Sequence, residues 1–269
     1  MLKEKRLLIT GVVNQESIAF ATAERAILEG AEIMLTSFPR DRHLTEDAAK
    51  LLPADVEVLD LDATDPDQVE SLSAHVGSLW GRLDGILHAI AFAPREALAG
   101  DFLEAGAEGV NLAFSTSAYS YAALARLLRD HAPDSGGSLV GLDFDAAGAW
   151  PVYNWMGVCK AALESVNRYL ARDLGPAGIR SNLIAAGPLL TRAAGGIPSF
   201  QTLLDAWEER SPMAWNAEDP APVAEVACFL FSDMARAMTG EIVHVDGGYH
   251  AMAGSLRSVP ATAAVGEAS

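Results

Sequence analysis

The chain has 269 residues, half of them hydrophobic, and 23 glycines, a composition that suits a globular protein with a sizeable core. Its formal net charge of -17 argues against non-specific nucleic-acid binding, which needs clustered lysine and arginine, and against contact with an anionic membrane surface. Its two cysteines and six histidines have no spacing typical of a disulfide framework or a metal site, so no metal is expected.

No uncharged apolar run in the sequence is long enough to cross a bilayer. Residues 1–6 are charged and lead directly into an apolar stretch, without the hydrophobic core of a secretion signal. We therefore expect a cytoplasmic protein that does not contact membranes.

Short apolar runs alternate with helical patterns along most of the chain. Ser17 is a good N-cap for a helix that Gly30 ends, and Asp65 followed by Pro66 is typical of another helix start. The predicted strands cover residues 7–10, 33–36, 56–61, 85–90, 138–142, 179–184 and 241–245. The predicted helices cover residues 18–29, 66–79, 109–129, 153–174, 200–209 and 223–231.

This alternation predicts an α/β fold, a doubly wound, Rossmann-like parallel sheet of about seven strands with helices on both faces. Ligands of such a sheet bind at the carboxyl ends of its strands. We expect residues 1–252 to form a single dinucleotide-binding catalytic domain, with a short substrate-binding segment near residues 191–210. Residues 253–269, rich in alanine, serine, glycine and valine, are expected to form a disordered tail.

Tyr153 and Lys160 stand seven residues apart in one apolar-rich helical segment. Seven helical steps return to nearly the same face, about 10.5 Å further along the axis, so a phenol and an ammonium would project into one cleft. The phenol stabilises a developing oxyanion, and the ammonium holds a ribose or biases the phenol's proton. The commoner dehydrogenase spacing places tyrosine four residues before lysine, and here that position is Met156. Alone, the pair also fits a packed tyrosine and a solvated lysine.

Gly11 follows the first predicted strand, and Ser17 opens the first predicted helix. A turn at this place puts backbone N–H groups and a helix N-terminus where a pyrophosphate binds. Gly11 is the only glycine of this loop, so the G-x-G-x-x-G fingerprint is absent. An ordinary strand-to-helix loop is therefore an equal alternative for this segment taken alone.

These motifs together resemble those of enoyl-acyl-carrier-protein reductases, which belong to the short-chain dehydrogenase/reductase superfamily. The resemblance spans roughly residues 3–250 and is most specific in Gly11 with Ser17-Ile18-Ala19 and in the spacing of Tyr153 and Lys160. Asp143-Phe144 and residues 153–156 look closest to the mycobacterial type. Further segments that agree cover residues 59–62, 88–94, 117–121, 180–182, 186–188 and 244–248.

The resemblance implies reduction of the 2,3-double bond of enoyl thioesters by hydride transfer from NADH, in fatty acid biosynthesis. It implies that Tyr153 binds the thioester carbonyl, that Lys160 binds the nicotinamide ribose and that Phe144 lines the catalytic pocket, while Ala93 touches the substrate. The cofactor contacts that it implies are Gly11, Ser17, Ile18, Phe38, Asp62, Ala63, Ile90, Ala91, Lys160, Leu189 and Thr191. Asp62 also fits a helix cap, and Phe144 also fits core packing.

Two other functions are alternatives to this one. A carbonyl (3-ketoacyl) reductase of the same superfamily is the first, and Met156 together with Ser138 at a strand's start speaks against it. A non-catalytic dinucleotide-binding protein is the second, and the presence of both Tyr153 and Lys160 speaks modestly against that.

The cofactor is expected to be NADH, with NADPH as the alternative. No carboxylate closes the second predicted strand, where an acid would bind a ribose 2′-hydroxyl. Arg40 favours a 2′-phosphate, whereas Phe38 resembles the aromatic residue of NADH-using relatives.

The expected substrate is an acyl-carrier-protein or CoA thioester, and the resemblance suggests a homotetramer. Carrier proteins are acidic, as is this chain, so docking would need a local basic patch, for which Arg95, Arg192 and Arg210 are the candidates. The segment between Thr191 and Trp207 is short, which predicts a preference for short or medium acyl chains.

Overall fold

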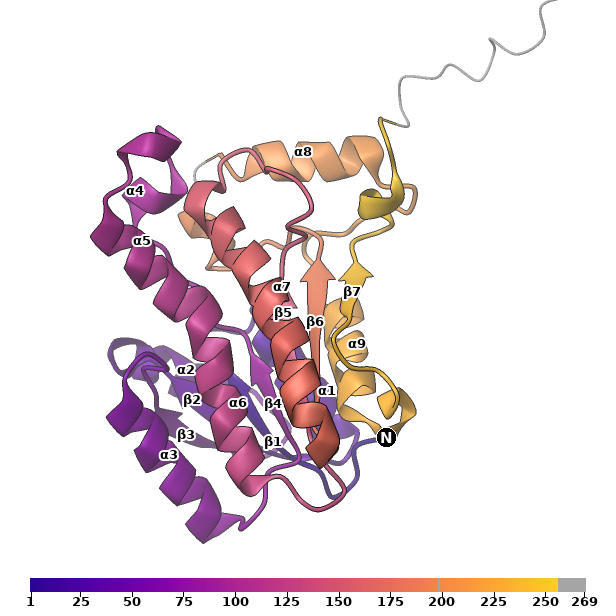
Figure 1. Ribbon diagram of the computed structural model, residues 1–269. Helices are drawn as coiled ribbons and strands as arrows, with labels where there is room; N and C mark the ends of the chain where they lie inside the picture. Colours follow the sequence, from indigo (N-terminus) through magenta and orange to yellow (C-terminus); the bar gives the residue numbers. More distant parts are fainter. Residues whose placement is uncertain (198, 256–269) are drawn as a thin grey trace, which may run out of the picture.

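In a computed structural model, which describes residues 1–197 and 199–255, seven strands form one parallel sheet in the order β3-β2-β1-β4-β5-β6-β7 (Figure 1). The strands are β1 (Arg6–Thr10), β2 (Glu32–Ser37), β3 (Glu57–Asp60), β4 (Gly85–His88), β5 (Ser138–Asp143), β6 (Arg180–Ala186) and β7 (Ile242–Val245). Every neighbouring pair is parallel, so all seven strands end at the same edge of the sheet. The predicted fold class is confirmed.

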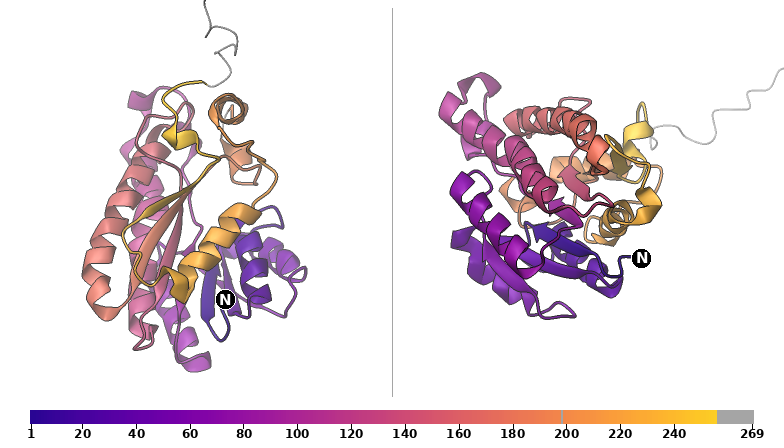
Figure 2. Two further views of the ribbon diagram at one scale, coloured as in Figure 1. Left: turned by 90° about the vertical axis from the view of Figure 1, so that its right-hand side faces the viewer. Right: turned by 60° about the horizontal axis from the view of Figure 1, so that its bottom comes forward.

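Helices cover both faces of the sheet (Figure 2). One face carries α1 (Ile18–Leu28), α2 (Arg42–Ala49) and α9 (Ala221–Phe231), and the other carries α3 (Pro66–Leu79), α6 (Ser120–His131) and α7 (Asn154–Leu174). Three further helices, α4 (Arg95–Leu98), α5 (Ala107–Phe114) and α8 (Gln201–Arg210), lie toward the carboxyl ends of the strands (Figure 1). These three helices therefore border the edge at which ligands are expected.

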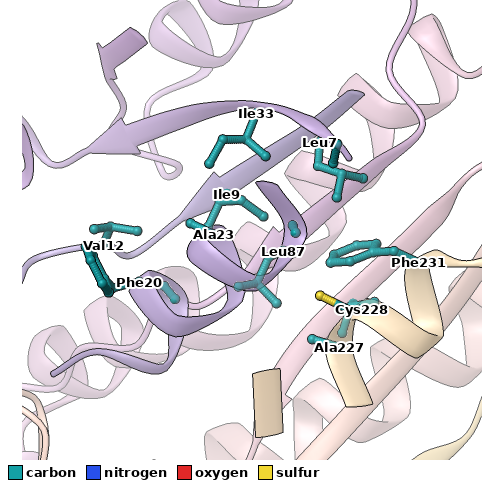
Figure 3. Packing of buried hydrophobic residues seen from close by; sticks show 14 of the residues in the cluster. Leu7, Ile9, Val12, Phe20, Ala23, Ile33, Leu87, Ala227, Cys228 and Phe231 are labelled. Carbon is teal, nitrogen blue, oxygen red and sulfur yellow. The ribbon is translucent and has the colours of Figure 1, made fainter. Parts of the chain in front are cut away.

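The side chains of β1 alternate between two hydrophobic cores, one on each face of the sheet. Leu7 and Ile9 pack with Phe20 of α1 and Phe231 of α9 (Figure 3). Leu8 points to the opposite face and packs in the core that α3, α6 and α7 cover. Because β1 is buried on both sides, its sequence is an unbroken apolar run. Burial of each such side chain stabilises the folded state by about 1.5–3 kcal/mol.

The predicted helix caps are confirmed. Ser17 precedes α1, and its Oγ accepts a hydrogen bond from the N–H of Phe20 at 3.1 Å. Asp65 precedes α3, and its carboxylate accepts from the N–H of Asp67 at 3.0 Å. Gly30 follows α1 with a φ of 96°, a conformation that glycine adopts without steric cost.

Several predicted boundaries are wrong. The helix predicted over residues 109–129 is interrupted, because a π-helical turn over Ser115–Tyr119 joins α5 to α6. The strand predicted over residues 85–90 ends at His88, and α2 has no counterpart among the predicted helices. The helix predicted from Tyr153 begins at Asn154.

The predicted tail over residues 253–269 lies outside the described residues from residue 256 onward. Among the residues that the structure describes, no helix combines the length and the apolar character needed to cross a membrane.

Candidate active site

The strand order reverses between β1 and β4, which is where doubly wound sheets bind their ligands. The hydroxyl of Thr10 holds the two strand ends together: it donates to the carbonyl of Leu87 at 2.8 Å and accepts from the N–H of Ala89 at 3.0 Å. Gly11 follows with a φ of 80°, and a Cβ there would lie 2.0 Å from the carbonyl oxygen of Ala89. Glycine is thus required for the chain to leave β1 against the end of β4.

Ser17 fixes the loop between Gly11 and α1. Its Oγ donates to the carbonyl of Asn14 at 2.8 Å while it caps the N–H of Phe20. Ile18, the first residue of α1, is half-buried and packs against the core of that face. No acidic residue lies in the first turn of α1, so the partial positive charge of the helix N-terminus is available to an anion.

Phe38 follows β2 at the same edge, and its ring is 44 % exposed. The guanidinium of Arg40 lies over this ring, 4.9 Å from its centroid. Arg40 also pairs with Asp41 at 3.4 Å, so its charge is partly compensated.

Asp62 and Ala63 follow β3. The Asp62 carboxylate accepts from the N–H of Thr64 at 2.9 Å and from its hydroxyl at 2.6 Å. The helix-cap alternative for Asp62 is wrong, because Asp65 caps α3 and Asp62 bonds only within the turn before it. Both bonds from Thr64 go to one carboxylate oxygen, which leaves the other oxygen to a ligand. Ala63 is buried.

Four more predicted cofactor contacts follow the ends of β4 and β6. Ile90 is half-buried and Ala91 is exposed, directly after β4. Leu189 is buried and Thr191 half-buried, after β6, and the hydroxyl of Thr191 accepts from the N–H of Ala194 at 3.2 Å. These residues share the carboxyl edge of the sheet with Gly11 and Asp62.

Tyr153 stands in a tight turn immediately before α7. Its neighbours Val152 and Asn154 have φ values of 58° and 35°, a left-handed conformation that is uncommon for a β-branched residue. The carbonyl of Tyr153 accepts from the N–H of Met156 at 2.9 Å, which starts the helix. Tyr153 thus precedes the first turn of α7. The helical spacing predicted to place Tyr153 and Lys160 on one face therefore does not hold between Tyr153 and Asn154.

The Tyr153 ring is buried beside Phe144, with the ring centroids 5.1 Å apart, and both share a hydrophobic cluster with Ala93. Burial raises the pKa of Tyr153 well above its ordinary value, and the Asp143 carboxyl adds to this rise. The phenol therefore stays protonated at neutral pH and acts as a hydrogen-bond donor.

Lys160 is buried on the inner face of α7, only 5 % exposed, and its Nζ donates to the carbonyl oxygen of Leu142 at 2.8 Å. Burial lowers the pKa of Lys160, and the nearby Asp143 carboxylate opposes that shift. The alternative that Lys160 is a solvated surface residue is therefore wrong.

Asp143, the last residue of β5, was not assigned a role from the sequence. It is 6 % exposed, and neither carboxylate oxygen has a hydrogen-bond partner among the described residues. Burial raises the pKa of Asp143 to about 7, although Lys160 acts in the opposite direction. Lys160 bonds the carbonyl of Leu142 and Tyr153 packs on Phe144, the residues on either side of Asp143, so the three groups lie around the end of β5. The sequence signal that could have identified Asp143 is an acidic residue at the end of an apolar strand.

His88, the last residue of β4, is a second buried polar group near Lys160. Its Nε2 lies 2.7 Å from the hydroxyl of Ser120, which itself donates to the carbonyl of Thr116 at 2.6 Å. Nε2 therefore carries the proton, and Nδ1 is an acceptor without a partner in the described chain. Burial, followed by the charge of Lys160, lowers the pKa of His88 to about 3, so the ring is neutral.

The arrangement offers a protonated phenol, a buried cation and unpaired acceptors at the ligand edge of the sheet. The phenol and the ammonium are suited to stabilise an oxygen on which negative charge develops, and the unpaired acceptors are suited to hydroxyl or amide donors of a ligand. Within the described residues, no group of three or more histidine, cysteine, aspartate or glutamate side chains is placed to hold a metal ion.

The sheet, its reversal point and the glycine turn define an α/β protein of the dinucleotide-binding type. A sequence model described as enoyl-(acyl carrier protein) reductase matches residues 11–250. The chain is 40 % identical over 262 residues to an enoyl-(acyl-carrier-protein) reductase (NADH) of Mycolicibacterium smegmatis, covering 92 % of this chain and 97 % of the relative.

Two further relatives bear the same name. One, from Aquifex aeolicus, is 40 % identical over 94 % of this chain and 93 % of its own length. The other, from Escherichia coli, is 39 % identical over 92 % of this chain and 95 % of its own length. The chain belongs to the enoyl-(acyl-carrier-protein) reductase family, as the resemblance in its motifs predicted.

Proposed function

We propose that the protein reduces the 2,3-double bond of enoyl thioesters with NADH, as a step of fatty acid biosynthesis. Family membership supports the reaction class, and the names of the relatives specify NADH. The single observation of the structure that carries the proposal is that the end of β5 contacts both groups: Lys160 bonds the carbonyl of Leu142, and the Tyr153 ring packs on Phe144.

Tyr153 is the proposed hydrogen-bond donor to the thioester oxygen. Burial keeps its phenol protonated, so it stabilises the negative charge that moves to this oxygen during reduction of the double bond. Phe144, in contact with the Tyr153 ring, fixes the ring's position and excludes water from this side, and Ala93 lines the same cluster. When bound, NADH supplies the hydride.

Lys160 is the proposed ribose ligand. A buried ammonium has three donors, and within the described residues only the bond to Leu142 is present, so two donors are available to hydroxyl groups. Gly11, Ser17 and Ile18 would hold the pyrophosphate, because the Gly11 turn and the start of α1 present backbone N–H groups there. The other proposed cofactor contacts are Phe38, Asp62, Ala63, Ile90, Ala91, Leu189 and Thr191.

The contacts of the Arg40 side chain favour NADH over NADPH. Its guanidinium already stacks on Phe38 and pairs with Asp41, which weakens its attraction for a 2′-phosphate. Michaelis constants measured with both cofactors test this choice, and a lower value with NADPH would reverse it.

The carbonyl-reductase alternative loses support from the environment of Ser138. Its hydroxyl donates to the carbonyl of Leu230 on α9 at 2.8 Å, on the face of the sheet opposite to α7. Met156, at the position of the commoner catalytic tyrosine, is buried in the hydrophobic cluster. The test is NADH oxidation with crotonyl-CoA and with acetoacetyl-CoA. Turnover of crotonyl-CoA alone supports the proposal, turnover of acetoacetyl-CoA alone contradicts it, and activity with neither points to the non-catalytic alternative.

The domain organisation is proposed as one catalytic domain over residues 1–252, with substrate contacts from residues 191–210. The proposed partner is an acyl-carrier protein or a CoA thioester, and a cytoplasmic location remains an expectation from the sequence. Arg95 and Arg192 are exposed and so are available to an acidic carrier protein, whereas Arg210 packs on Tyr249. Charge reversal of Arg192 should slow carrier-linked turnover more than CoA-linked turnover.

A homotetramer is the proposed assembly. Side chains on α5, the π-turn and α7 leave apolar surface exposed where these elements pack side by side, at Leu112, Phe114, Tyr119 and Val158. A second copy of the same face would cover this surface symmetrically. Sedimentation of the wild type and of Val158→Glu tests this, since a monomeric wild type would contradict the assembly.

A further inference from the structure

Five aromatic side chains form a continuous cluster that begins at Tyr153, with tilted ring contacts except for one stacked pair. The ring centroids lie 5.1 Å apart for Tyr153 and Phe144, 4.9 Å for Phe144 and Trp150, and 5.6 Å for Phe144 and Trp207. Trp207 and Tyr249 stack at 3.9 Å with an angle of 10° between their planes. We refer to these five residues as the aromatic column.

The column joins segments that are distant in the sequence. Phe144 directly follows β5, Trp150 precedes α7, Trp207 lies on α8 and Tyr249 begins the 3-10 turn after β7. In Figure 1, α8 lies across the carboxyl ends of β6 and β7, next to this last turn. The column therefore fills the space between the proposed catalytic tyrosine and α8.

Hydrogen bonds and stacking hold the column in place. The indole N–H of Trp207 donates to the carbonyl of Asp246 at 2.9 Å, and that of Trp150 donates to the carbonyl of Asp145. The guanidinium of Arg210 covers the Tyr249 ring, 4.5 Å from its centroid. Trp207 is 3 % exposed and Tyr249 8 %. Displacing Trp207 would leave its buried indole N–H without a partner, and displacing Tyr249 would break its contacts with Trp207 and Arg210.

An acyl tail extends from the same thioester carbonyl that Tyr153 is proposed to bind. In an open apolar channel every two further methylene groups would strengthen binding by about tenfold. Here a tail that passes Phe144 meets Trp150, Trp207 and Tyr249, so the gain from each methylene is offset by lost ring contacts. We infer that the aromatic column restricts the enzyme to enoyl thioesters with short acyl groups. This inference rests on the proposed function and specifies its substrate class.

The test is kcat/KM for trans-2-enoyl-CoA thioesters of increasing length, from crotonyl through hexenoyl and octenoyl to dodecenoyl, with NADH. We expect values that stay level or fall with length. Values that rise by about tenfold for every two methylene groups would indicate an open channel and overturn the inference while leaving the proposed function intact. Activity with no member of the series would instead overturn the proposed function, and the inference with it.

Two substitutions test the column itself. Tyr249→Ala and Trp150→Ala each open space beyond Phe144, so the ratio of dodecenoyl to crotonyl kcat/KM should rise by about tenfold, the gain from two newly buried methylene groups. Tyr249→Phe keeps the ring and should retain the wild-type ratio. A readout independent of turnover is competitive binding of saturated acyl-CoA thioesters to the enzyme–NADH complex. The affinity for dodecanoyl-CoA relative to butyryl-CoA should rise in the alanine variants only. An unchanged ratio in both alanine variants, with NADH binding retained, would overturn the inference.

Discussion

The ammonium of Lys160 donates a hydrogen bond to the carbonyl oxygen of Leu142, 2.8 Å away, and so ties α7 to the end of β5. The neighbouring Asp143 carboxylate supplies opposite charge, but neither of its oxygens has a hydrogen-bond partner in the described chain. A buried ammonium with unused donors is costly unless a ligand completes its hydrogen bonds. This cost supports the proposal that Lys160 is held in position for a ligand rather than for the stability of the fold.

Lys160→Ala should weaken NADH binding. The substitution removes charge-assisted hydrogen bonds to the ribose, which contribute about 1.5–3 kcal/mol each, so the dissociation constant should rise by about tenfold or more. Titration of protein with NADH by fluorescence measures it. Lys50→Ala is the control, because Lys50 is exposed and pairs with Asp47 on the surface. Equal NADH affinity in wild type and Lys160→Ala would contradict the proposal that Lys160 binds the ribose.

Tyr153→Phe should lower kcat by about a hundredfold, with little change in NADH affinity. Phenylalanine retains the ring that packs on Phe144, so the loss is that of the hydroxyl donor. Steady-state kinetics with crotonyl-CoA and an NADH titration separate the two effects. Tyr169→Phe, on an exposed part of α7, serves as the matched control. If Tyr153→Phe retained wild-type kcat, the phenol would not be the donor.

The fold was predictable from the sequence because its signals are local. Ser17 and Asp65 cap their helices as expected, and the apolar run of β1 alternates between two cores. The π-helical turn was not predictable from periodicity, because it depends on a distant contact. Ser117 in this turn exchanges hydrogen bonds with the backbone N–H and carbonyl of Phe92, both at 3.0 Å.

The candidate site was only partly predictable. The spacing of Tyr153 and Lys160 identifies them as candidates, but the side chains around them come from several strand ends and helices. His88 and Asp143 approach Lys160 only because β4 and β5 are neighbours in the sheet. Tyr249 meets Trp207 only through the turn after β7, so no sequence spacing indicates the aromatic column.

Asp143 should make the stability of the protein depend on pH below neutrality. Its folded-state pKa of about 7 lies above the ordinary 3.8, so between about pH 4 and 7 the folded protein holds a proton that the unfolded chain has lost. Raising the pH through this window therefore favours unfolding, by up to about 1.4 kcal/mol per pH unit. Lys160 opposes this effect, and Glu164 and Asp145 reinforce it.

Asp143→Asn removes this titration. Urea unfolding at several pH values should show that the variant gains stability relative to wild type as the pH rises from 4 to 7. Asp130→Asn, which removes a surface carboxylate next to Arg129, controls for the change in net charge. A constant difference between Asp143→Asn and wild type across this range would contradict the prediction.

Ser17→Ala should combine a loss of stability with a loss of cofactor affinity. Removal of a helix cap costs about 1 kcal/mol, and the Ser17 hydroxyl also fixes the loop through Asn14. Ser232→Ala removes an equivalent cap on the 3-10 turn Asp233–Ala235, away from the proposed cofactor contacts, and should cost about the same stability. Only Ser17→Ala should raise the Michaelis constant for NADH. A parallel rise in Ser232→Ala would mean that cofactor affinity follows general stability instead of this loop.

Gly11→Ala should be far more destabilising than Gly100→Ala, although both glycines have positive φ values, 80° and 89°. At Gly100 the new Cβ meets no atom within 4 Å, so only the backbone conformation is strained, at a cost of about 1–2 kcal/mol. At Gly11 the same Cβ would lie 2.0 Å from the Ala89 carbonyl oxygen, so the ends of β1 and β4 would have to separate at this turn. Thermal unfolding of the two variants isolates the clash, because the conformational strain is common to both. Equal losses of Tm would mean that the ends of β1 and β4 are not held together as the hydrogen bonds of Thr10 indicate.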